Sequence, residues 1–212
     1  GAGGRSSGGD VAELDVVSVP TLAEALDMVM GWPGGDRRLL IELKGPFAGI
    51  PAVPGRMLRW SRLIRHEAPV YEGLAAAVAQ LLEPHIVAIR AKRIFVQSFY
   101  MPYLQELRQL MPELSLLYLC LTPRPGCLER EQVLGAADEL GLVGLSVRHS
   151  FLSAAAVSRL HERRLLVFAW TVDAMGDLSA AAAAGVDGVI TNCPRRAVDL
   201  WSTRLPSHEL AG

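Results

Sequence analysis

Short apolar runs alternate along the chain with longer segments in which apolar residues recur every three or four positions. Most of the short runs are nearly continuous rather than alternating, which is typical of parallel strands covered on both faces of a sheet. This pattern predicts strands at Leu39–Leu43, Ile94–Phe99, Leu114–Leu119, Leu142–Val147, Leu165–Thr171 and Gly188–Thr191.

The longer segments between these runs have the period of helices. Thr21 followed by Glu24 forms a capping-box pattern at the start of the first one. Gly141 and Gly185 stand where helices should end, since glycine readily adopts the left-handed backbone conformation of a C-cap. We predict helices at Thr21–Met30, Tyr71–Arg90, Pro102–Leu110, Leu128–Leu140, Ser153–Arg163 and Met175–Ala184.

Strict alternation of strand and helix predicts an α/β fold with right-handed crossovers. No glycine-rich phosphate loop follows any strand, so a dinucleotide-binding open sheet has no support. The string "AAAAGVDGVITN" resembles the entry to the last strand of many (β/α)₈ barrels. Such a TIM barrel needs eight strands and about 250 residues. We therefore expect residues 1–212 to form one partial barrel domain with six β/α units, the first two being missing from the N-terminal side. Residues 1–18 are interpreted as a linker and residues 45–66 as an insertion.

Composition narrows the classes of partner. Half of the 212 residues are apolar and the formal net charge is −1, so a sizeable core is expected and nucleic acid is not. The three cysteines have no spacing typical of a disulfide framework or a zinc site. No apolar run reaches the roughly 18 residues of a membrane helix. The sequence leaves the compartment and the oligomeric state open, with the cytoplasm favoured.

The predicted strand ends carry the candidate chemistry, because barrel active sites lie at the carboxyl ends of the strands. Glu42 and Lys44 are two residues apart, so they point to the same face of an extended chain. A carboxylate suits a divalent cation and a lysine suits a phosphate oxygen. A purely structural ion pair at the barrel mouth is the alternative. The other strand ends contribute Ser98, Phe99, Thr122, His149, Trp170, Thr171, Thr191 and Asn192.

Five motifs, in order, carry a resemblance to a known family: "VPTLAEAL", "LLIELKGP", "VQSF", "AWTVD" and "GVDGVITNCP". Together they resemble the glycerophosphodiester phosphodiesterases. The resemblance implies a (β/α)₈ barrel that uses Ca²⁺ or Mg²⁺ to cleave glycerophosphodiesters into glycerol 3-phosphate and an alcohol, in lipid and glycerol metabolism. It also implies that Glu42 is a metal ligand, that Lys44 stabilises phosphate charge, and that Phe99 and Trp170 line the substrate pocket.

The histidines depart from the family pattern. The family opens with a His-Arg-Gly strand and has a His-Asp pair further on, and these two histidines act as general acid and base. The histidines singled out here match neither motif; they are His66, His85, His149 and His161. The resemblance therefore implies that this chain alone is inactive.

The family's Glu-x-Asp metal pair is also in question. Glu13 and Asp15 have the right spacing, but "VPTLAEAL" follows at once and leaves no room for the His-Asp segment. We prefer to interpret these residues as linker, with the metal pair as the alternative. Asn192 stands where an aspartate is usual.

Two other functions stay open at this point. One is a non-catalytic barrel protein that binds or scaffolds after losing its acid–base strands. The other is a phospholipase-like diesterase acting on different phosphate head groups.

Overall fold

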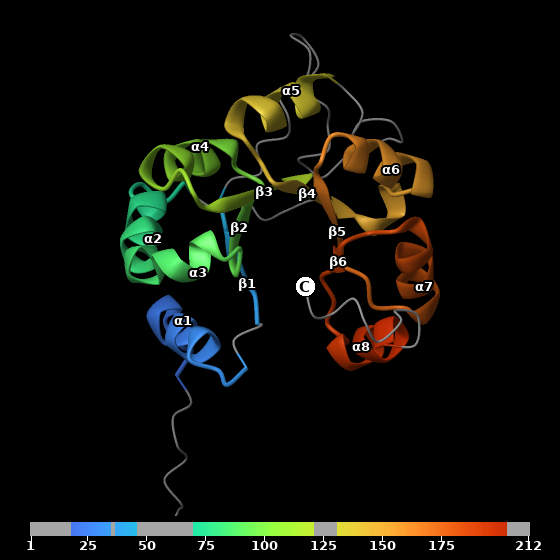
Figure 1. The fold of residues 1–212 in the computed structure, drawn as a ribbon, viewed down its shortest axis with the longest axis horizontal. Coiled ribbons are helices and arrows are strands. Elements are labelled where there is room, and N and C mark those ends of the chain that lie inside the picture. The colour runs from blue at the N-terminus through green and yellow to red at the C-terminus, as the bar shows by residue number, and fades with distance from the viewer. Residues whose placement is uncertain (1–17, 35–36, 46–69, 121–130, 203–212) are drawn as a thin grey trace, which may run out of the picture.

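Six parallel strands form a single sheet in sequence order, β1-β2-β3-β4-β5-β6. The computed structural model describes residues 18–34, 37–45, 70–120 and 131–202. The sheet curls, and the helices lie along its outer, convex side (Figure 1). This arrangement is the wall of a (β/α) barrel, which confirms the predicted fold class. The strands are β1 (Leu39–Leu43), β2 (Ile94–Ser98), β3 (Ser115–Cys120), β4 (Gly144–Arg148), β5 (Leu166–Trp170) and β6 (Gly188–Val189).

The helices occupy most of the predicted segments. They are α1 (Leu22–Met30), α2 (Leu74–Leu82), α3 (Ile86–Arg90), α4 (Met101–Leu110), α5 (Glu131–Leu140), α6 (Ala154–Glu162), α7 (Met175–Ala184) and α8 (Pro194–Ser202), with short 3₁₀ turns η2 (Glu83–His85) and η3 (His149–Phe151). None of the helices in the described ranges is long and apolar enough to cross a membrane.

Local sequence signals account for the ends of several helices. The Thr21 hydroxyl accepts a hydrogen bond from the Glu24 amide (3.3 Å), and the Glu24 carboxylate accepts one from the Thr21 amide (2.7 Å). This confirms the capping box. Gly185 ends α7 with φ 81°, and Gly141, directly after α5, has φ 61°. Both glycines adopt the left-handed conformation expected after a helix.

Several predictions of the helices and strands were wrong. The single helix expected at Tyr71–Arg90 is divided into α2, η2 and α3, with Pro84 at the start of the 3₁₀ turn. Proline lacks the amide hydrogen that a continuous helix needs, so it favours a break. The strand expected at Gly188–Thr191 ends at Val189. Helix α8 was not among the predicted helices.

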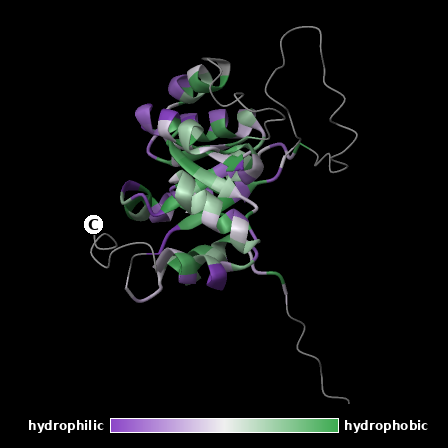
Figure 2. Cartoon of the chain, turned by 90° about the vertical axis from the view of Figure 1, so that its right-hand side faces the viewer, coloured by the Kyte–Doolittle hydropathy of each residue, from purple (hydrophilic) through white to green (hydrophobic). Residues whose placement is uncertain are grey.

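Side chains alternate between the two faces of the sheet. The outward-pointing residues of neighbouring strands form one continuous core with the helices, and Figure 2 shows the strands in hydrophobic colours with polar colour on the outer helix faces. Burying each large aliphatic side chain of this kind contributes roughly 1.5–3 kcal/mol. The outward set includes Ile41, Leu43, Ile94, Val96, Leu116, Tyr118, Leu145, Val147, Val167 and Ala169.

The other face of the sheet, which is the concave one, carries a different set. Phe95 and Phe168 lie at 6.4 Å between ring centroids, and Gln97 and Ser146 are buried polar residues. Glu42 is the β1 partner of Gln97 in the sheet register, so the two residues share this face. The concave face is therefore the more polar of the two.

In the part of the chain that the structure describes, no strand pairs with the outer edge of β1 or of β6. An eight-stranded barrel has no such edges, since every strand has two neighbours. The described residues thus form six units of a barrel wall, as the sequence predicted.

Close approach of β4 and β5 generates a stability prediction. A Cβ atom on Gly144 would lie 2.3 Å from the backbone oxygen of Leu166, whereas one on Gly135 in α5 would meet nothing within 4 Å. We expect Gly144→Ala to lower the free energy of unfolding by roughly 2–4 kcal/mol, because two backbones must separate. Gly135→Ala should raise it by about 0.5–1 kcal/mol, since alanine favours helix. Urea unfolding of both variants decides the matter, and equal stabilities would contradict the observed packing.

Candidate active site

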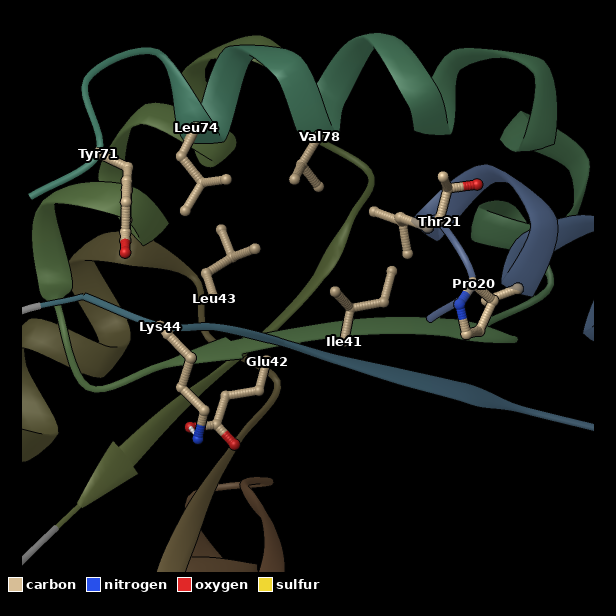
Figure 3. A pocket seen from close by; sticks show the side chains of 11 residues that line it. Pro20, Thr21, Ile41, Glu42, Leu43, Lys44, Tyr71, Leu74 and Val78 are labelled. Carbon is tan, nitrogen blue, oxygen red and sulfur yellow. Dashed lines mark hydrogen bonds and ion pairs between the residues drawn. The ribbon is translucent and has the colours of Figure 1, made fainter. Parts of the chain in front are cut away.

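Glu42 and Lys44 lie together at the carboxyl end of β1. The Lys44 ammonium is 2.6 Å from a Glu42 carboxylate oxygen. Figure 3 shows both side chains on one side of the strand, while Ile41 and Leu43 point to the other side. The side chain of Lys44 is 73% exposed and that of Glu42 is 27% exposed. The pair therefore has the shared face that the sequence predicted, and it is open to ligands.

An apolar groove of about 570 Å³ lies on the opposite side of β1. Its walls include Ile41 and Leu43 from the strand and Leu74 and Val78 from α2 (Figure 3). Glu42 and Lys44 line it too, but their side chains point away from the residues on α2. The groove therefore belongs to the packing of strand against helix and not to the charged pair.

Phe99 and Trp170 form an aromatic pair at the same end of the sheet. Their ring centroids are 5.5 Å apart and their planes meet at 86°, an edge-to-face arrangement. The Trp170 indole nitrogen donates a hydrogen bond to the Ser146 backbone oxygen (2.9 Å). This bond occupies the only donor of the indole, so Trp170 can offer only apolar surface to a bound molecule.

Two polar residues on the concave face were not recognised from the sequence. The Ser146 hydroxyl donates to the Gln97 side-chain oxygen (2.7 Å), and both residues are buried. The sequence did contain a signal for this pair. Gln97 is a polar residue on the same face of the predicted strand as the aromatic residues Phe95 and Phe99. Its importance depends on Ser146, which is 49 residues away in the sequence.

Ser98 does not belong to the concave face, although it was one of the strand-end candidates. It is fully buried, and its hydroxyl donates to the Leu43 oxygen (2.8 Å) and accepts from the Tyr100 amide (3.0 Å). Ser98 thus joins the ends of β1 and β2 to the start of α4. Thr122 lies outside the described residues.

The Asp173 carboxylate binds the last two strand-end candidates, Thr191 and Asn192. It accepts hydrogen bonds from the Thr191 hydroxyl (3.0 Å), the Asn192 amide (2.7 Å) and the Asn192 side chain (2.9 Å). These bonds, those from Asn192 above all, hold the pKa of the Asp173 carboxyl below its usual value. Thr191 and Asn192 are thereby held to the loop that follows Trp170.

The described histidines have other neighbours. The His149 ring nitrogen Nδ1 is 3.9 Å from Asp177 of α7. His161 lies 2.9 Å from Asp187, whose carboxylate also accepts from the Val167 amide near the amino end of β5. His161 is therefore at the opposite end of the strands from Glu42. His85 lies in η2, while His66, Glu13 and Asp15 fall outside the described residues.

A divalent cation such as Ca²⁺ takes six to eight oxygen ligands. The described parts of the chain contain no group of three or more histidine, cysteine, aspartate or glutamate residues that could hold a metal ion. Glu42 thus supplies a single carboxylate, and the described residues do not form a metal site by themselves. Cys120 belongs to the buried core, and complete burial raises the pKa of its thiol.

A curled parallel sheet covered by outer helices, with charged and aromatic side chains at its carboxyl edge, is the scaffold of a (β/α)-barrel enzyme. Residues 54–196 match the Glycerophosphoryl diester phosphodiesterase family. The match covers more than half of the chain, and the chain belongs to this family. The matched range includes Phe99 and Trp170 but begins after Glu42 and Lys44.

Individual relatives agree with this family. YhdW of Bacillus subtilis (strain 168), named as a glycerophosphodiester phosphodiesterase, is 29% identical over 126 residues, which are 59% of this chain and 49% of YhdW. The chain thus spans about half the length of this curated relative. A structure described as a glycerophosphoryl diester phosphodiesterase from Silicibacter pomeroyi DSS-3 is similar with a TM-score of 0.62 and 26% identity, covering 86% of this chain and 57% of that one.

A third similarity supports the fold alone. The structure of an Oleispira antarctica phosphodiesterase in complex with the product sn-glycerol-3-phosphate has a TM-score of 0.59 and 20% identity to this chain, covering 86% of this chain and 61% of that one.

The hydrogen bonds of Asp173 generate a pH-dependent prediction. Because the pKa of this carboxyl is lowered by folding, its stabilising contribution is complete above its ordinary value of 3.8 and is lost as the pH falls through the lower folded value. Asp173→Asn removes the charge and keeps the shape. We expect this variant to melt at a lower temperature than wild type at pH 7, with the difference shrinking as the pH falls below about 4.

Melting curves from pH 2 to pH 7 measure this difference. Asp27→Asn, on the exposed face of α1, is the matched control and should melt like wild type throughout. A difference between wild type and Asp173→Asn that stays constant over the whole pH range would show that the charge of Asp173 does not contribute.

Proposed function

We infer that the whole protein hydrolyses glycerophosphodiesters to glycerol 3-phosphate and an alcohol. The family membership supports this reaction class. The observation that carries the proposal is the placement of Glu42 and Lys44 at the carboxyl end of β1, on the concave face, with a 2.6 Å contact between them. A paired anion and cation that are open to solvent suit a negatively charged ester and its counter-cation.

Lys44 is the phosphate-binding residue of this proposal. Its side chain is 73% exposed, so its ammonium can leave Glu42 and approach a phosphate oxygen. An exposed ion pair contributes only about 0–1 kcal/mol to stability, so little is lost in the exchange. This small value also argues against the purely structural interpretation of the pair.

Glu42 contributes one ligand to a divalent cation, Ca²⁺ or Mg²⁺, whose other ligands come from outside the described residues. Bound there, the cation would polarise the phosphate and neutralise its charge. Phe99 and Trp170 line the substrate pocket. Since the Trp170 donor is bonded to Ser146, this wall contacts carbon atoms of the substrate and excludes water.

General acid and base catalysis requires groups that this chain does not supply in the family's pattern. The His-Arg-Gly and His-Asp motifs are absent from the sequence, and His149 and His161 lie beside Asp177 and Asp187 instead of Glu42. Each positioned acid or base group typically supplies about 10²–10⁴-fold. We therefore propose that residues 1–212 expressed alone hydrolyse glycerophosphocholine only at the background rate.

Release of choline by the purified 212-residue chain, with and without Ca²⁺ or Mg²⁺, tests this proposal. Metal-dependent turnover would contradict it, and would indicate that a histidine of this chain acts as a base.

Substitution of the charged pair separates the roles of its two members. In the whole protein, Glu42→Gln removes one negative charge from the cation, so metal affinity and activity should fall, with activity partly recovered at high metal concentration. Lys44→Met should lower turnover without weakening metal binding, because its charge acts on the phosphate in the transition state. Calorimetric metal titrations and steady-state rates measure both effects.

Asp138→Asn is the matched control, since it breaks another exposed ion pair, the 2.8 Å contact to Arg163. It should leave metal affinity and rate unchanged. If Glu42→Gln binds metal as tightly as wild type, the assignment of Glu42 is wrong. If neither variant loses activity, the charged pair takes no part in catalysis, whereas absence of activity in the wild-type whole protein would favour the non-catalytic binding function.

A further inference from the structure

Gln97 is the most unusual residue of the concave face. It lies in the middle of β2, it is only 3% exposed, and its neighbours in the alternation are the aromatic Phe95 and Phe99. Burying a primary amide among apolar side chains costs free energy unless its donors and acceptor have partners. The positions of those partners therefore indicate what the residue does.

Only one end of the amide has a protein partner. The Gln97 oxygen accepts from the Ser146 hydroxyl at 2.7 Å. Among the described residues, the bond from Ser146 is the only hydrogen bond shown for the Gln97 side chain, and the amide nitrogen is not one of the fully buried atoms left without a partner, so it remains accessible. Because the oxygen is bound by Ser146, the two N–H groups of the planar amide remain available to a ligand.

The strand register shows which residue lies beside Gln97 on the concave face. Glu42 of β1 is the direct register partner of Gln97, and both residues are on the concave face. Lys44 follows Glu42 on the same face and contacts it at 2.6 Å. The Gln97 side chain thus projects from the concave face one strand away from the charged pair.

The geometry points to Gln97 as a ligand-contacting residue whose amide N–H groups donate to a phosphate oxygen held by Lys44, with Ser146 as the positioning residue that fixes the amide. This inference rests on the proposed function, because it places a phosphate ester at the charged pair. A neutral donor suits this place. It binds an anionic oxygen without adding a second positive charge that would compete with Lys44 for Glu42.

Ser146 gives this arrangement its rigidity. Its hydroxyl holds the Gln97 oxygen, and its backbone oxygen holds the Trp170 indole at 2.9 Å. One residue of β4 therefore orients both the polar donor on β2 and the apolar wall on β5. A preorganised donor loses little entropy on binding, so each contact retains more of its free energy.

The test measures binding of glycerol 3-phosphate and of inorganic phosphate to the whole protein by calorimetry. Gln97→Leu and Gln97→Glu both remove the N–H donors, one without charge and one with a negative charge. We expect both to weaken binding of both ligands, by about 10- to 100-fold, which is the usual value of a hydrogen bond to a charged group. Ser146→Ala keeps the N–H donors of Gln97 but removes the hydroxyl that fixes the amide. It should therefore weaken binding less than the Gln97 substitutions do.

Several outcomes would overturn the inference. If only Gln97→Glu weakens binding, the effect is charge repulsion and Gln97 donates nothing. If glycerol 3-phosphate binding falls while inorganic phosphate binding is unchanged, Gln97 contacts the glycerol and not the phosphate. If wild type binds neither ligand, the proposed function itself fails, and the inference fails with it.

Two controls separate binding from folding. Gln105→Glu places the same charge on the exposed face of α4 and should bind like wild type. Melting curves of each variant identify loss of fold, and Ser146→Ala, the smallest change, decides the question if Gln97→Glu does not fold. Wild-type affinity in a folded Ser146→Ala would show that Ser146 does not position the amide.

Discussion

The packing of Ile41 and Leu43 against α2 is the constraint on which the rest of the site depends. Successive side chains of a strand point to opposite faces, so burying these two residues on the convex side forces Glu42 and Lys44 to the concave side. Burial of the two aliphatic side chains contributes roughly 3–6 kcal/mol together. The exposed ion pair contributes about 1 kcal/mol at most. Hydrophobic packing therefore determines where the charges point, and the charges are left available for a ligand.

The other strands of the sheet show the same division between outward-facing core residues and inward-facing residues. On β2, Ile94 and Val96 join the outer core while Phe95 and Gln97 face inward. On β5, Val167 and Ala169 face outward and Phe168 and Trp170 inward. Every strand thus uses one half of its residues for stability and the other half for the inner surface. Function can vary on the inner surface without loss of the outer core, which is consistent with the diversity of reactions in barrel enzymes.

Much of the fold was predictable because its signals are local. The apolar runs located all six strands, since a buried parallel strand needs no partner in sequence to be recognised. Thr21 with Glu24, and Gly185, marked helix ends through contacts within a few residues. The misassigned boundary at Pro84 and the missed helix α8 are errors of a different kind. The error at Pro84 arose because a local helix breaker was given too little weight, and α8 was not recognised in the sequence.

The features of the candidate site also divide into those that follow from local sequence and those that depend on tertiary contacts. The sequence by itself determined that Glu42 and Lys44 share a face and that Phe99 and Trp170 stand at strand ends, because strand alternation and order are local properties. Only the tertiary structure decided that Ser98 faces outward to Leu43, that Asp173 holds Thr191 and Asn192, and that Ser146 joins Gln97 to Trp170. Each of these contacts spans 18 to 55 residues. No local pattern encodes a partner at such a distance, because the partner is determined by which strands become neighbours when the sheet curls.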